Sequence, residues 1–157
     1  MSAVSDTQFT CDADIERVAS GMIGCTLPKD EWTHAAHWAT ALWLIARWPD
    51  LYPPADMPGL IRRYNVTTGG VNSETAGYHE TITQASLRAG RTMLAEAMPG
   101  DPVMATLERL LASPLGKSTW LLDYWSKDRL MSVEARARWV EPDLAPFVFP
   151  AFPPREA

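Results

Sequence analysis

The stretch that decides the fold is residues 28–47, PKDEWTHAAHWATALWLIAR. At about 100° per residue, its apolar side chains cover nearly the whole helix circumference, with Trp38 and Trp43 on different sides. Pro28 suits the first turn of a helix, and Pro49 stops it. Because a helix that is apolar all round needs burial, this segment predicts the buried central helix of the protein.

Helical periodicity continues along most of the chain, and no segment of useful length alternates with the period of a strand. The pattern predicts an all-α fold, a compact bundle of about five to seven helices in a single domain, 1–157. Its core would cover about 12–141, followed by a proline-rich C-terminal tail over 142–157. Besides 28–47, we expect helices at 12–23, 57–65, 74–98, 102–112, 117–125 and 133–140, the last capped by Ser132.

Composition and charge exclude several classes of protein. The chain is 46% apolar and 21% charged with a formal net charge of −5, and no Lys/Arg cluster is dense enough to follow a nucleic acid. The longest apolar stretch, 35–46, is shorter than the roughly twenty residues of a membrane span. The first twenty residues are polar and acidic, which predicts no secretion signal. We therefore expect a soluble cytoplasmic protein whose two cysteines are reduced.

The three histidines are the strongest functional signal. Glu31, His34 and His37 share an arc of about 120° on the predicted helix 28–47. His79 lies at the edge of the apolar stripe of the predicted helix 74–98 and can face the core, whereas Glu80 points away toward an Arg or Gln one turn on. Imidazole and carboxylate groups are typical ligands of zinc, iron and manganese, so this set predicts a metal site.

Topology predicts where that site would lie. If consecutive helices alternate in direction, the N-terminal turns that carry His34 and His79 lie at the same end of the bundle. The loop over 66–73 would cover a polar pocket there, with Arg63, Tyr64 and Asn72 near its rim.

The function expected from this site is that of a metal-dependent enzyme, hydrolytic or oxidative, acting on a small molecule. His34, His37, His79 and Glu31 would hold one divalent transition metal, zinc, iron or manganese. Glu31 could instead serve as a general base, and Tyr78 could donate a phenolic proton. Arg63, Tyr64 and Asn72 would contact the substrate.

The alternative is a non-catalytic module that binds a ligand or another protein. A buried histidine is commonly a structural group bonded to a backbone carbonyl, and the tryptophans could face a second copy in a homodimer. The spacing of the histidines leaves both readings open, as it does the identity of the metal.

Three phrases resemble a small family of bacterial proteins with no assigned activity, over about residues 28–145: Glu31-Trp-Thr-His-Ala-Ala-His37, Gly77-Tyr-His-Glu-Thr-Ile-Thr83 and Ala135-Arg-Ala-Arg-Trp-Val-Glu-Pro-Asp143. The resemblance implies an all-helical fold and no particular reaction. In architecture the chain is also similar to DinB-type bundles, which hold a metal with three histidines. Because their paired histidines come late in the chain and at wider spacing, no residue role is carried over from them.

Overall fold

The computed structural model describes residues 9–155 and is all-α, with no strand in that range. The predicted fold class is thereby confirmed. The α-helices are α1 (Asp12–Ile23), α2 (His34–Arg47), α3 (Pro53–Thr67), α4 (Glu80–Ala95), α5 (Val103–Ala112), α6 (Lys127–Leu130) and α7 (Val133–Ala137). Short 3₁₀ helices are η2 (Lys29–Glu31), η3 (Pro114–Gly116) and η4 (Trp120–Asp123). The ends of the predicted domain, residues 1–8 and 156–157, lie outside the described part.

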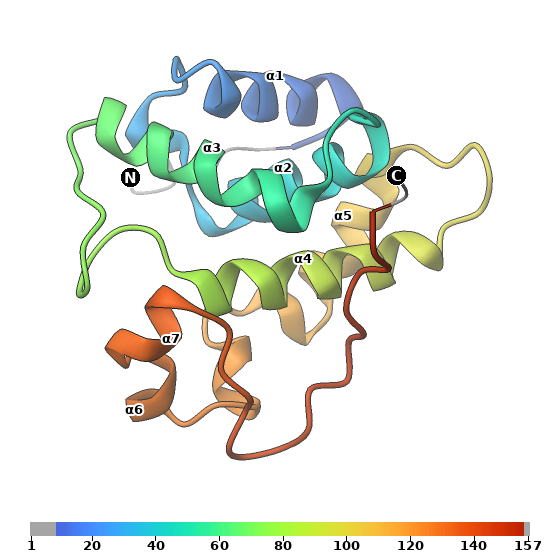
Figure 1. The fold of residues 1–157 in the computed structure, drawn as a ribbon. Coiled ribbons are helices and arrows are strands. Elements are labelled where there is room, and N and C mark those ends of the chain that lie inside the picture. The colour runs from blue at the N-terminus through green and yellow to red at the C-terminus, as the bar shows by residue number, and fades with distance from the viewer. Residues whose placement is uncertain (1–8, 156–157) are drawn as a thin grey trace, which may run out of the picture.

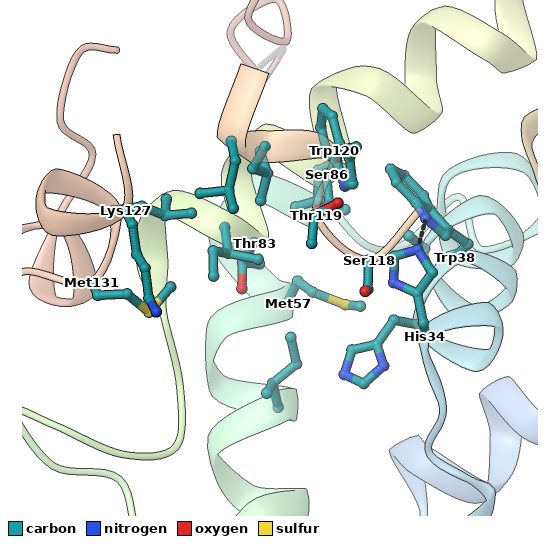
Figure 2. Close-up of a pocket in the computed structure, with 18 residues that line it drawn as sticks. His34, Trp38, Met57, Thr83, Ser86, Ser118, Thr119, Trp120, Lys127 and Met131 are labelled. Carbon is teal, nitrogen blue, oxygen red and sulfur yellow. Dashed lines mark hydrogen bonds between the residues drawn. The ribbon is translucent and has the colours of Figure 1, made fainter. Parts of the chain in front are cut away.

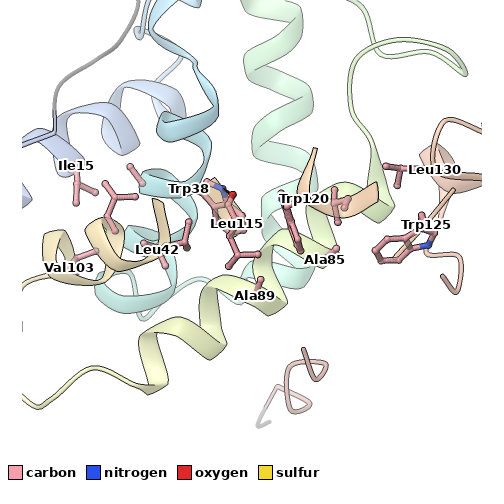
Figure 3. Packing of buried hydrophobic residues seen from close by; sticks show 14 of the residues in the cluster. Ile15, Trp38, Leu42, Ala85, Ala89, Val103, Leu115, Trp120, Trp125 and Leu130 are labelled. Atoms are coloured by element: carbon pink, nitrogen blue, oxygen red, sulfur yellow. Dashed lines mark hydrogen bonds between the residues drawn. The ribbon is translucent and has the colours of Figure 1, made fainter. Parts of the chain in front are cut away.

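The central helix is α2, which packs against α1, α3, α4 and α5 (Figure 1). Its buried residues divide between two apolar clusters. Trp38 and Leu42 join the cluster with α4, α5 and the segments that follow α5, shown in Figure 3. Ala41 and Leu44 join the cluster with α1 and α3. The sequence prediction of a buried central helix is therefore correct for its α-helical part.

The predicted helix 28–47 is interrupted near its start, which corrects the prediction. Thr33 has extended backbone angles, and its hydroxyl accepts a hydrogen bond from the Ala36 N–H at 3.1 Å. A threonine in this position is a favourable N-cap, so the α-helix begins at His34 and only a 3₁₀ turn precedes it. Glu31 is consequently on a different element from His34 and His37, and the shared helical arc does not exist.

The fourth helix is also shorter than predicted, because it begins at Glu80 instead of residue 74. Gly77 has φ of +85°, and a Cβ there would lie 2.1 Å from the Val71 carbonyl oxygen. Only glycine fits this turn of the loop that leads into α4. His79 is thus the N-cap of α4, with its side chain accepting from the Ile82 N–H.

After α7 the chain continues without regular structure along the outside of the molecule (Figure 1, red). Phe147 and Phe149 pack against the aromatic cluster of Trp120, Tyr124 and Trp125. Further on, the Tyr52 hydroxyl before α3 donates to the Pro153 carbonyl at 2.6 Å. The described part of the proline-rich tail, to residue 155, is therefore held against the helices at Phe147, Phe149 and Pro153, while many of its other residues are exposed.

Candidate functional site

A cavity of about 630 Å³ lies between α2, α3, α4 and residues 118–131 (Figure 2). Most of its wall is apolar, with polar groups distributed around it. The main apolar residues are Trp38, Ala41, Met57, Ile61, Ile82, Leu87, Trp120, Leu121, Leu130 and Met131. The polar ones are His34, His37, Thr83, Ser86, Ser118, Thr119 and Lys127.

His34 stands in the cavity wall and connects α2 to η3. Its Nε2 lies 3.2 Å from the Leu115 carbonyl oxygen, and the Trp38 indole N–H donates to the same oxygen at 3.1 Å. The indole nitrogen also lies 3.3 Å from Nε2 of His34, the contact dashed in Figure 2. One carbonyl thus holds both side chains in place, while Nδ1 of His34 has no hydrogen-bond partner within residues 9–155.

His37 lies one turn further along α2 and lines the same cavity. Its Nδ1 donates to the Thr33 carbonyl at 2.7 Å, and its ring stacks on Trp32 with 3.9 Å between centroids. Neighbouring protein atoms displace water from the ring and lower the pKa of His37 below 6.5, although the side chain still reaches solvent. The donated Nδ1–H leaves Nε2 as a lone-pair acceptor.

His79 is a structural group in this conformation. Its Nδ1 accepts from the Ile82 N–H at 3.1 Å, and its Nε2 donates to the Leu130 carbonyl at 2.6 Å. Both ring nitrogens are therefore used by the fold, and neither is available as a ligand unless these bonds open. His37 and His79 both line a second hollow beside the cavity, whereas His34 does not line it.

Glu31, the predicted ligand or base, does not line the cavity. Its Oε1 accepts from the Arg17 guanidinium on α1 at 2.9 Å, in a partly exposed ion pair. The N-cap at Thr33 causes this, because the chain leaves helical geometry between Glu31 and His34.

The three predicted substrate-contacting groups support the fold and do not line the cavity. The buried Tyr64 hydroxyl donates to the Leu27 carbonyl at 2.8 Å, and Arg63 donates to the Ile23 carbonyl. The Asn72 carboxamide oxygen accepts from the Tyr78 N–H at 3.0 Å, which holds the loop before α4.

Tyr78 lies in a second hollow of about 570 Å³, which joins the first at His37, Ile61, Ile82 and Thr83. Its hydroxyl donates to Oε1 of Glu80 at 2.5 Å. Burial, and then this hydrogen bond, raise the pKa of Tyr78 well above its ordinary value of 10.0. The other oxygen of Glu80 accepts from Gln84 at 3.3 Å, so the expected partner one turn on is confirmed.

No group of three or more His, Cys, Asp or Glu side chains within residues 9–155 is placed to hold a metal ion. The histidine metal site therefore stays a prediction. After the hydrogen bonds above, Nδ1 of His34 and Nε2 of His37 are the imidazole atoms left uncommitted at the cavity.

Residues 118–131 form one side of the cavity that the sequence does not predict. Figure 2 shows Lys127 and Met131 beside each other on the side opposite His34. The sequence indicates only packing for this region, because Trp120 and Trp125 suggest helices docked on a core. Trp120 packs on the core, with 5.7 Å between its ring centroid and that of Trp38, and it also lines the cavity.

No protein-family model, curated protein or solved structure matches this chain. Within the part of the chain that the structure describes, no helix has both the length and the apolar character to cross a membrane.

Proposed function

We propose that this protein binds a predominantly apolar small molecule in the 630 Å³ cavity between α2, α3, α4 and residues 118–131. The proposal rests on one observation, the volume of this cavity together with the residues that line it. Small-molecule sites typically enclose about 300–1,000 Å³, with mostly apolar walls and a few placed polar groups. This is the ligand-binding alternative of the sequence reading, with His79 as a structurally bonded histidine.

The polar groups in the wall support a ligand site over a packing defect. Native interiors are close-packed, and voids much larger than a water molecule are few. Within residues 9–155, the hydroxyls of Ser86, Ser118 and Thr119 donate no hydrogen bond to another protein group, so they are available to a ligand in the cavity.

Binding is tested by titrating the protein with the neutral fluorophore N-phenyl-1-naphthylamine. We expect saturable enhancement of the probe emission and quenching of the tryptophan emission, because Trp38 and Trp120 stand in the wall. The variant Ser86→Trp should lose this binding by filling the cavity. The matched control on the same helix is Ala95→Trp, at an exposed position outside the cavity, which should keep it. Equal binding by both variants would place the probe elsewhere and contradict the proposal.

A second candidate is metal-assisted chemistry in the same cavity, supported by the uncommitted nitrogens of His34 and His37. A backbone carbonyl on the opposite ring nitrogen, as on His37, is the usual support of a metal-binding imidazole. Elemental analysis of protein purified without an affinity tag or chelator tests this idea. Near-stoichiometric zinc, iron or manganese that is lost in His34→Ala/His37→Ala would support it. A metal content that is unchanged by the double substitution would remove these residues from consideration.

A further inference from the structure

The charges around the cavity differ in sign from those of the whole chain. The protein has a formal net charge of −5, with nineteen Asp and Glu against fourteen Lys and Arg. Yet no Asp or Glu of residues 9–155 lines the cavity, and Lys127 does. Apart from the two histidines, the ionisable side chain in the lining of this cavity is therefore a cation, in a protein that is acidic as a whole.

Lys127 is available to a ligand. It is exposed, and its ammonium makes no ion pair or hydrogen bond with another group in the part of the chain that is described. Most arginines are engaged otherwise: Arg17 pairs with Glu31, for example, and Arg88 stacks on Trp139 at 4.0 Å. The Lys127 side chain lies beside Met131, on the side of the cavity opposite His34 (Figure 2).

We propose that the ligand is an anionic amphiphile, a monocarboxylate with an apolar chain, whose carboxylate pairs with Lys127 while the chain enters the cavity. This inference rests on the proposed function. A single ammonium matches one negative charge, and no Asp or Glu of the described residues lines the cavity to repel a carboxylate. Met57, Leu87 and Leu130 offer apolar contacts for the chain.

The test is displacement of bound N-phenyl-1-naphthylamine by dodecanoate and by methyl dodecanoate, which share the chain and differ in charge. Concentrations stay below those at which either compound aggregates. We expect dodecanoate to compete roughly threefold to fivefold more strongly at low salt, in the range of an exposed ion pair. The preference should shrink as added salt screens the pair.

Two substitutions of Lys127 test whether its ammonium binds the carboxylate of dodecanoate. Lys127→Gln should remove the preference for dodecanoate over the ester, whereas Lys127→Arg should keep the preference. The matched control is Lys117→Gln, at an exposed lysine outside the cavity, which should behave as the native protein.

These experiments distinguish failure of the anionic head group from failure of the cavity as a binding site. If dodecanoate and the ester compete equally and Lys127→Gln changes nothing, the anionic head group is overturned and the apolar cavity site stands. A preference for dodecanoate that persists in Lys127→Gln would overturn the assignment of Lys127. If the probe itself does not bind in the cavity, the proposed function fails and this inference with it.

Discussion

At the scale of single residues, the imidazole of His79 connects α4 with α6. It caps α4 through the Ile82 N–H, and it holds α6 through the Leu130 carbonyl. His79 is 7% exposed, so both bonds are shielded from competing water. An unpaired group in such a place is costly, because the lost bond is not replaced by hydration.

Substitution of His79 should separate these two roles. We expect His79→Ala to lower the free energy of unfolding by about 2–3 kcal/mol, through loss of a cap and a buried hydrogen bond. His79→Asn restores an acceptor for the cap and should recover about 1 kcal/mol of this. Urea denaturation measures the unfolding free energies of the native protein, His79→Ala and His79→Asn. Native-like stability of His79→Ala would refute the structural role.

The stability should also depend on pH through His79. Burial, and then the positive charge of Arg136, lower the pKa of His79 below 6.5, outweighing the Leu130 hydrogen bond. The unfolded chain therefore takes up this proton at higher pH than the folded protein does. The contribution of His79 is fully present above about pH 6.5 and declines as the pH falls through its folded-state pKa. In urea titrations from pH 7.5 to 5, the stability difference between native protein and His79→Asn should shrink toward acid. A difference that is constant or grows would contradict this sign.

At the scale of elements, side chains from neighbouring segments hold helix ends. Both oxygens of Asp12, at the start of α1, accept from the first N–H groups of α5, those of Val103 at 3.1 Å and Met104 at 2.8 Å. Pro102 precedes α5 and has no side-chain acceptor of its own. A residue distant in sequence thus caps α5 and ties it to α1.

Loss of this cap should destabilise the protein without changing its fold. We expect Asp12→Ala to lower the unfolding free energy by about 1–2 kcal/mol, the usual cost of an N-cap. Glu16→Ala, at an exposed position on the same helix, should change it by less than about 0.5 kcal/mol. Chemical denaturation compares them. Equal stability of the two variants would mean that the Asp12 bonds contribute nothing in solution.

Local signals predict some elements well and others poorly. The helix 12–23 is predicted with the bounds that α1 has, because its apolar spacing has no competing cap inside it. The starts of α2 and α4 are missed because Thr33 and His79 act as N-caps within stretches of helical periodicity. The third helix, predicted to begin at residue 57, begins at Pro53 instead, since Pro53 and Pro54 occupy the first turn of α3, where a missing N–H costs nothing.

At the scale of the whole molecule, the C-terminal segment wraps from α7 to the start of α3 (Figure 1). Its phenylalanines are packed on the helices and alternate with exposed neighbours. Phe147 lies 5.2 Å from Trp125 and 4.9 Å from Tyr124, between ring centroids, whereas Val148 is 66% exposed. Because Phe147 also contacts Trp120, the tail supports one wall of the cavity.

Truncation of one aromatic should show this support. We expect Phe147→Ala to lower the melting temperature and the unfolding free energy by about 1–3 kcal/mol, less than for a fully buried ring because Phe147 is only half-buried. It should also weaken probe binding in the cavity. Val148→Ala is the neighbouring control and should be neutral. Differential scanning calorimetry compares them, and the same melting temperature for both would argue against a stabilising tail.

The cavity illustrates what the sequence could not predict. His34 and His37 are visible in the sequence as an unusual pair, and both line the cavity. Ser118, Thr119 and Lys127 reach the same cavity through the path of the chain after α5, where the predicted helix 117–125 is wrong and only the short 3₁₀ helix η4 forms.

The most direct test of the central claim is a methyl NMR titration with dodecanoate. We expect saturable changes in the chemical shifts of the methyl groups of Met57, Leu87 and Leu130, which line the cavity. The methyl groups of Met22 and Leu110, which are buried elsewhere in the core, should not shift. Changes confined to the cavity would locate the ligand there. Spectra that stay unchanged at every dodecanoate concentration below aggregation, or shifts at Met22 and Leu110 alone, would contradict a binding site between α2, α3, α4 and residues 118–131.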